Sequence, residues 1–259
     1  MVKGLYTAYT GMINEQNRMD IMTNNLANAS TVGYKKEGST SQSFDDVLTV
    51  KIKDQSVGMR NVQRLGVKNP GVKIGENYTD YSQGSFRITG NTYDLALSGE
   101  GFFAIEFTNK AGETDTKYTR AGQFTLNKDG YLVTEAGDYV LDTQNRRIRL
   151  NTLIDSSITD DGTIYQNGQA VAKIQVTDFE DYDYLEKYGE TYYQPIQGAK
   201  TIAAKAQVKS GYLEMANVQI VSEMVNLISI TRAYESNQKV VQTIDDTLDV
   251  AVNQIGRVQ

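Results

Sequence analysis

The chain has 259 residues, of which 39% are hydrophobic and 22% charged, and its formal net charge is −6. It contains no cysteine and no histidine, which excludes Cys/His nucleophile pairs, Ser-His-Asp triads and zinc sites with thiolate or imidazole ligands. The acidic balance, without any basic run, argues against nucleic-acid binding through phosphate neutralisation. No apolar run approaches the ~20 residues of a membrane-spanning helix, and the first residues lack the apolar core of a secretory signal.

The first predicted element is a helix from about Lys3 to Ala29. Its heptad position holds apolar residues throughout, and such a repeat calls for a partner helix. An Asn-rich stretch followed by Gly33 predicts the end of this helix. The heptad residues are Leu5, Met12, Met19 and Leu26.

Residues 35–75 are polar, punctuated by glycine and only weakly periodic. This pattern predicts an extended connector, for which a plain surface loop is the alternative. The segment is too long for an ordinary connection, which favours a role in contacts with other molecules.

Residues 76–205 show short alternating runs separated by turn signals, which is typical of a barrel-like or sandwich-like β domain. The predicted hairpin turns are Lys128-Asp129-Gly130, Asp161-Gly162 and Asn167-Gly168. The predicted strands are Asp94–Leu97, Phe102–Phe107, Tyr131–Val133, Tyr139–Leu141 and Ala172–Val176.

From Gly211 to about Gly256 the pattern predicts a second helix. Apolar repeats at opposite ends of a chain can pair with each other only if the termini come together. We therefore predict an α+β fold: a coiled-coil-like helical stalk made by residues 1–34 with 211–259, a connector at 35–75, and a central all-β domain at 76–205. The heptad residues of the second helix are Ile220, Leu227, Tyr234, Val241, Leu248 and Ile255.

Three segments are candidates for chemistry. The Gly99-Glu100-Gly101 sequence favours a tight turn over a phosphate site, because the third glycine and the following helix are missing. The acidic run from Asp178 to Tyr184 favours an exposed loop over a cation site or a glycosidase carboxylate pair. The third segment, Asp245 to Asp249, is either a solvated helix face or a contact with cations supplied by a neighbouring subunit.

Blocks at both ends and in the middle of the chain closely resemble the bacterial flagellar basal-body rod protein family, in particular its distal (FlgG) and proximal (FlgF) types. They are GLYTAYTGM, the stretch from Asp20 to Lys36, DLALSGEGFFAI, YTRAGQFTLNKDGYLVTEAGDYVLD, and the stretch from Gly211 to Asp249. The blocks occur in the family's order and span nearly the whole chain. Met215-Ala216 departs from the family pattern before Asn217. The residues that match the family motif are Asn24, Asn25, Asn28, Gly33, Tyr34, Gly211, Glu214, Asn217, Arg232, Tyr234, Glu235 and Asn237.

The resemblance implies a structural subunit of the flagellar basal body, beyond the cytoplasmic membrane, and not an enzyme. It implies export by the flagellar type III apparatus, helical polymerisation with copies of itself, contacts with other rod proteins and the hook protein, and transmission of torque. No cofactor, metal, small-molecule substrate or nucleic acid is expected. The alternatives are a carboxylate-dependent cell-wall glycosidase and a secreted adhesin-like β protein.

Overall fold

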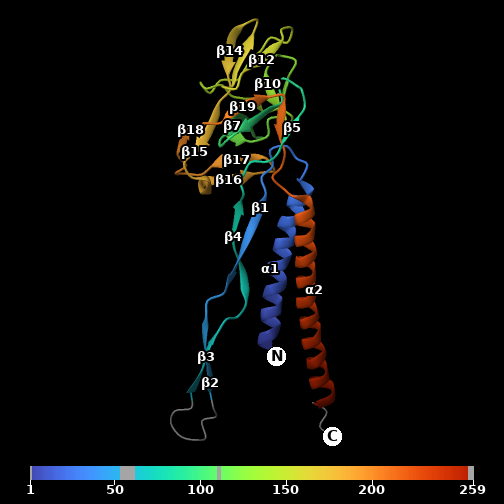
Figure 1. The fold of residues 1–259 in the computed structure, drawn as a ribbon. Helices are drawn as coiled ribbons and strands as arrows, with labels where there is room; N and C mark the ends of the chain where they lie inside the picture. Colours follow the sequence, from blue (N-terminus) through green and yellow to red (C-terminus); the bar gives the residue numbers. More distant parts are fainter. Residues whose placement is uncertain (1, 53–61, 110–111, 256–259) are drawn as a thin grey trace. The chain divides into compact units, whose positions relative to one another are not determined.

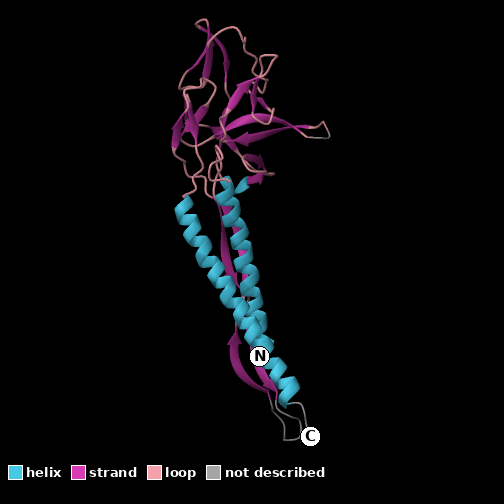
Figure 2. Ribbon diagram, turned by 90° about the vertical axis from the view of Figure 1, so that its right-hand side faces the viewer, coloured by secondary structure: helices cyan, strands magenta, loops and turns pink. Residues whose placement is uncertain are grey.

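The computed structural model describes residues 2–52, 62–109 and 112–255, which have an N-terminal helix, a central β-rich region and a C-terminal helix (Figures 1 and 2). The predicted α+β class is confirmed. The chain divides into two compact units: unit 1 comprises residues 1–26, 37–80 and 220–259, and unit 2 comprises residues 27–36 and 81–219. No helix in the described part of the chain is long and apolar enough to cross a membrane.

Unit 1 contains both long helices and two pairs of strands. Helix α1 spans Val2–Ala27 and α2 spans Ile220–Val250, followed by a π-helical turn over Ala251–Ile255. Strands β1 (Glu37–Ser43) and β4 (Val72–Thr79) pair antiparallel, as do β2 (Val47–Ile52) and β3 (Val62–Lys68). The segment predicted as a connector therefore consists largely of paired strands.

Within unit 1, helix α1 contacts the strands through polar groups. Thr7 Oγ1 donates to the Pro70 carbonyl oxygen at 3.1 Å, and Asn14 Nδ2 donates to Ser41 Oγ at 3.1 Å. Near the helix end, the Asn25 amide donates to the Glu37 carbonyl at 2.8 Å and accepts from the Glu37 amide at 2.9 Å. These bonds hold α1 against β1 and the residues before β4.

A different side of α1 approaches α2. A Cβ atom placed on Gly4 would lie 3.6 Å from Ile244 Cδ1, and one placed on Gly11 would lie 2.9 Å from Asn237 Nδ2. From the first of these contacts to the second, the residue number in α1 rises by seven while the residue number in α2 falls by seven, so the two helices run antiparallel. The glycines lie on one face because seven residues correspond to about two helical turns.

The predicted start of the second helix, at Gly211, is wrong. Strands β19 (Gln207–Ser210) and β20 (Tyr212–Glu214) precede the helix, and Gly211 between them has φ +82°. Leu213 is buried, and β20 pairs with β5 (Phe86–Ile88). Burial of Leu213 and this pairing hold the segment in extended form, so helix formation begins only at Ile220.

Unit 2 is built on a nine-stranded sheet with the path β16-β17-β8-β7-β11-β10-β9, to which β15 and β18 are joined through β7. Its remaining elements are a three-stranded sheet, β12-β13-β14, and two small strand pairs. The bounds are β6 Leu95–Ser98, β7 Phe102–Thr108, β8 Thr114–Thr119, β9 Phe124–Leu126, β10 Leu132–Thr134, β11 Tyr139–Val140, β12 Ser156–Ile158, β13 Thr163–Gln166, β14 Gln169–Lys173, β15 Val176–Phe179, a 3₁₀ turn Tyr182–Tyr184, β16 Leu185–Tyr188, β17 Tyr192–Pro195 and β18 Thr201–Ala203.

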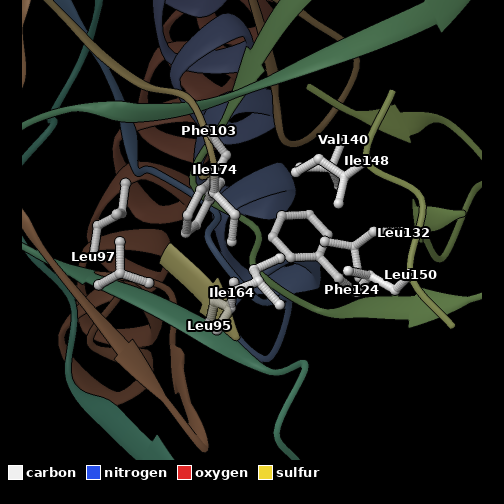
Figure 3. Close-up of a cluster of buried hydrophobic side chains, with 11 residues drawn as sticks. Leu95, Leu97, Phe103, Phe124, Leu132, Val140, Ile148, Leu150, Ile164 and Ile174 are labelled. Carbon is white, nitrogen blue, oxygen red and sulfur yellow. The ribbon is translucent and has the colours of Figure 1, made fainter. Parts of the chain in front are cut away.

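Strand β7 lies between two hydrophobic clusters. Phe103 belongs to a cluster that includes Phe124 and Ile164, which Figure 3 shows converging from several strands. Phe102 and Ala104 belong to a second cluster. Successive side chains of a strand point to opposite faces, so residues 102–105 of β7 are buried on both sides and form a continuous apolar run.

The turn signals of the β region are confirmed. Gly130, Gly162 and Gly168 have φ between +77° and +81°, and each lies between paired strands. The predicted strand Ala172–Val176 is interrupted, because β14 ends at Lys173 and β15 begins at Val176. Ile174, in the gap, is buried in the first core cluster and bridges to Asp142 instead.

Candidate functional site

Several family-motif residues of unit 2 lie at or beside a buried ion cluster centred on Glu214. The Glu214 side chain is fully buried, and its Oε1 accepts from Lys35 Nζ at 2.7 Å while its Oε2 accepts from Arg120 Nη1 at 3.3 Å. The exposed fractions of the Lys35 and Arg120 side chains are 1% and 3%. One carboxylate therefore joins three segments that are far apart in the sequence.

Backbone groups complete this cluster. Gly84 N donates to Glu214 Oε1 at 3.0 Å, Gly33 N donates to the Glu214 carbonyl at 2.8 Å, and Lys35 Nζ also donates to the Ser82 carbonyl at 2.7 Å. A Cβ on Gly84 would lie 1.9 Å from the Met215 carbonyl oxygen, and one on Gly33 would lie 2.3 Å from a backbone nitrogen. The segments approach so closely that only glycine fits at both positions.

Asn217 continues the same junction. Its Oδ1 accepts from Lys36 N at 2.8 Å, and its Nδ2 donates to Ser82 Oγ at 3.1 Å. Tyr34, the chain neighbour of Lys35, has no exposed surface and faces the Lys187 ammonium, which is 4.2 Å from the ring centroid. Gly33, Tyr34, Glu214 and Asn217, predicted from the motif alone, thus meet within unit 2.

Sequence reasoning did not single out Lys35, Arg120, Ser82 or Gly84. Lys35 and Arg120 lie inside the quoted motif blocks, and a charged residue within an otherwise strand-like stretch is a signal that could have drawn attention to them. A buried carboxylate needs a cation and several hydrogen bonds to compensate the lost solvation. Glu214 has all of these, so the cluster stabilises the packing of these distant segments of the chain against one another.

The heptad stripe of α2 largely follows the less exposed side of the helix. Leu227, Tyr234, Val241 and Leu248 are half-buried, and Ile230, three residues after Leu227, is 3% exposed. Ile220 differs, with 46% of its surface exposed. The side chain of Ile255 lies outside the described residues. On α1, Leu5, Met12, Met19 and Leu26 are all half-buried.

The motif residues on the helices occupy mixed environments. Asn25 is buried and Asn24 is exposed, although they are neighbours in the chain. Arg232 and Glu235 are exposed on α2, whereas Asn237 is half-buried and faces Gly11 of α1. In unit 2, Asn28 is buried and its Oδ1 accepts from Thr31 Oγ1 at 3.2 Å.

A second apolar stripe on α2 was not predicted. Val221, Val225 and Ile228 are 77%, 61% and 53% exposed, and Met224 is 47% exposed. Helix α1 carries a similar stripe, formed by Tyr6, Tyr9 and Ile13. Helix residues three or four apart share a face, so each set is a continuous apolar surface. Within residues 220–230, apolar residues cover more of the helix surface than the heptad stripe alone, which is the sequence signal for such a surface.

The other candidate sites have structural explanations. Gly99 and Gly101, with φ +117° and +133°, form the predicted tight turn between β6 and β7. Asp178 is 6% exposed, which corrects the prediction of an exposed loop at that residue, and it accepts from the Tyr182 hydroxyl at 2.8 Å. Burial, together with this bond, raises the pKa of Tyr182. In the described part of the chain, no three metal-binding side chains form a group suited to an ion.

Three family models match the chain. They are the flagellar basal body rod FlgEFG protein C-terminal region over residues 209–255, the flagellar hook protein FlgE/F/G D1 domain over residues 96–168, and the flagella basal body rod protein family over residues 5–35. The first and third of these models cover most of the two helices, and the second covers much of the β sheet of unit 2.

Full-length relatives agree with these models. The chain is 34% identical to the flagellar basal-body rod protein FlgG of Bacillus subtilis, over 98% of this chain and 99% of the relative. It is 32% identical to the rod protein FlgF of Caulobacter vibrioides, over the whole of both chains. The chain belongs to the flagellar basal-body rod protein family.

Membership gives this protein a structural function in the flagellar basal body. The family is one of structural proteins, not of enzymes, and its members are parts of the hook-basal body complex. A further relative, the flagellar hook-basal body complex protein FlhO of Bacillus subtilis, is 30% identical over the whole of both chains.

Proposed function

We propose that this rod protein polymerises helically through its terminal helices, which form a coiled-coil-like stalk within each subunit and contact neighbouring subunits. In this proposal the helices within residues 1–34 and 211–259 form the axial domain, the paired strands within residues 35–75 a connector, and residues 76–205 the larger part of a sandwich-like β domain. The antiparallel contacts of Gly4 with Ile244 and of Gly11 with Asn237 support the stalk. The two core clusters on opposite sides of β7 support the layered β domain.

The observation that carries the proposal is the apolar surface left open on both helices. Val221, Val225 and Ile228 are each more than half exposed on α2. Burying apolar surface stabilises an interface by about 25 cal/mol per Å², and an exposed contiguous patch marks an interaction site. Subunits repeated along a rod would cover such faces many times over.

The heptad residues then have two roles. Leu227, Tyr234, Val241 and Leu248, with Leu5, Met12, Met19 and Leu26, hold the helices of one subunit together. Ile220 is exposed like the second stripe of α2, so we assign it to contacts between subunits. The motif residues Arg232 and Glu235 are exposed, which suits contacts of the same kind.

We further propose that the subunit is exported unfolded by the flagellar type III apparatus and then transmits torque between motor and hook. The complete absence of cysteine supports this, because no disulfide has to be broken before export or formed after it. Its partners would be copies of itself, other rod proteins and the hook protein. Torque transmission needs many contacts in parallel, which a helical polymer supplies.

Replacement of Leu227 tests this function. Leu227→Asp places a carboxylate on the half-buried face of α2, where desolvation is costly. In a strain that depends on this chain, swimming and rod assembly should be lost while unit 2 stays folded by circular dichroism. Asn226→Asp adds the same charge at the adjacent exposed position and should leave swimming intact. Normal swimming of the Leu227→Asp strain would reject the proposal.

A further inference from the structure

Unit 1 carries a groove whose lining is mainly apolar and includes one lysine from α1 and one from β3. Its volume is about 280 Å³, and it lies between the first turns of α1 and the strands β2 and β3. Tyr6 and Val47 in the groove are 62% and 57% exposed. The residues that line it are Lys3, Tyr6, Val47, Thr49, Lys68 and Pro70.

The two lysines of the groove carry charges that are accessible to a partner. Both are exposed, and neither forms an ion pair within the described residues. Exposed apolar side chains together with two ammonium groups match a partner that carries an apolar side chain close to carboxylates. The chemistry of the groove therefore specifies an acidic, partly apolar segment.

The same chain offers such a segment at the end of α2. Asp245, Asp246 and Asp249 are exposed, and none of them pairs with a lysine or arginine in the described part of the chain. Val250, beside them, is 43% exposed. At about 100° per residue, Asp246, Asp249 and Val250 lie on the side of α2 away from Ile244, which contacts α1.

A chain cannot place its own α2 end in this groove while its helices are paired. Gly4 contacts Ile244 of α2, whereas Tyr6 lies about 200° around α1 from Gly4. The groove and the helix α2 therefore occupy different sides of α1. The acidic segment that reaches the groove must come from another molecule.

We propose that the groove binds the acidic end of α2 from a second copy of this chain, with Lys3 and Lys68 facing Asp246 and Asp249 and with Val250 against Tyr6 and Val47. The proposal rests on polymerisation of the subunit and names one contact in it. The two surfaces differ, so the contact is head-to-tail and repeats from copy to copy instead of closing as a two-fold dimer. An open helical assembly needs a contact of that kind.

Charge reversal tests the pairing. Lys3→Glu with Lys68→Glu should make the groove repel the acidic helix end and lower swimming and rod yield about tenfold or more. Adding Asp246→Lys and Asp249→Lys to the same chain should restore both. The matched control is Lys73→Glu, which changes an exposed lysine of β4 outside the groove. This variant should swim normally. Failure of the reciprocal reversal to restore assembly would overturn the proposal.

Cross-linking gives a readout that does not depend on activity. The chain has no cysteine, so single cysteines can be introduced without background. Cells that express a Lys68→Cys chain together with an Asp249→Cys chain should yield a covalent dimer when isolated basal bodies are treated with a bifunctional maleimide. Neither variant alone should give this product, and Lys73→Cys with Asp249→Cys should give much less.

The possible results of these experiments distinguish a failure of the groove contact from a failure of the proposed rod function. Basal bodies that contain both variants but form no more dimer than the Lys73→Cys control would reject the groove contact and leave the rod function intact. If the unaltered chain did not restore rods in a strain lacking it, the proposed function itself would fail. Circular dichroism of each purified variant checks that unit 2 remains folded.

Discussion

The two units of this protein bury their apolar side chains to very different extents. Unit 2 holds both hydrophobic clusters and the fully buried Glu214. In unit 1, among the described hydrophobic side chains, only Ala8 and Ile230 are buried. Unit 2 therefore has the core of an independent domain, whereas unit 1 exposes the apolar surface that a partner subunit would cover.

Limited proteolysis of the dilute monomer should give the largest difference between the units. Arg232 and Lys239 in unit 1 and Lys128 and Lys173 in unit 2 all have exposed side chains, so trypsin can reach each of them. Cleavage also needs local opening of the backbone, which costs little where few apolar contacts resist it. We expect the unit 1 sites to be cut faster by about two orders of magnitude. Equal rates would show that the helices are already rigid in the monomer.

Loss of the Glu214 charge should have the largest effect on the stability of unit 2. Glu214→Gln leaves the buried Lys35 and Arg120 without this carboxylate, so we expect the free energy of unfolding to fall by about 3–5 kcal/mol. The matched control is Glu106→Gln, which removes a surface pair with Arg147 and should cost about 0–1 kcal/mol. Urea denaturation followed by circular dichroism measures both. Equal losses of unfolding free energy in the two variants would mean that the buried cluster contributes no more to stability than a surface ion pair does.

Tyr192 should make unit 2 less stable at high pH. Burial, with the hydroxyl's hydrogen bond to Asp138, raises the pKa of Tyr192 to about 12. The unfolded chain loses this proton more readily, so stability is fully present below pH ~10 and declines as pH rises toward 12. Tyr192→Phe should reduce that decline in a urea titration across this range. Tyr184→Phe, at an exposed position, should not.

The smallest effect is expected at the face of α1 that contacts α2. Gly4→Ala places a methyl group at van der Waals distance from Ile244 and should favour the helix by up to about 1 kcal/mol. Gly11→Ala would place its methyl group only 2.9 Å from the Asn237 amide nitrogen, so it should stabilise the helix less than Gly4→Ala does. Helicity of the monomer by far-ultraviolet circular dichroism compares the two. A larger gain for Gly11→Ala would argue against the antiparallel register.

Local sequence patterns predicted the structure correctly where the conformation of a short segment depends mainly on its own residues. The Asn167-Gly168 turn and the tight turn at Gly99 and Gly101 were predicted because few residue types adopt positive φ at low cost. The continuous apolar run of β7 was also recognisable as a strand. The start of α2 was not, because the helix-like pattern from Gly211 onward competes with the pairing of β20 to β5 and with the ion cluster at Glu214.

Local sequence patterns sufficed to predict the periodic elements: two terminal helices with apolar stripes, a β-rich middle and the motif blocks that indicate the family. Which charges meet and which apolar faces stay exposed depends on the tertiary structure. Glu214 lies 179 residues after Lys35 in the chain and yet 2.7 Å from its ammonium. No local propensity encodes such a contact, because it depends on how distant segments pack. For the same reason, only the fold distinguishes the buried Ile230 from the exposed Ile228 on the same helix.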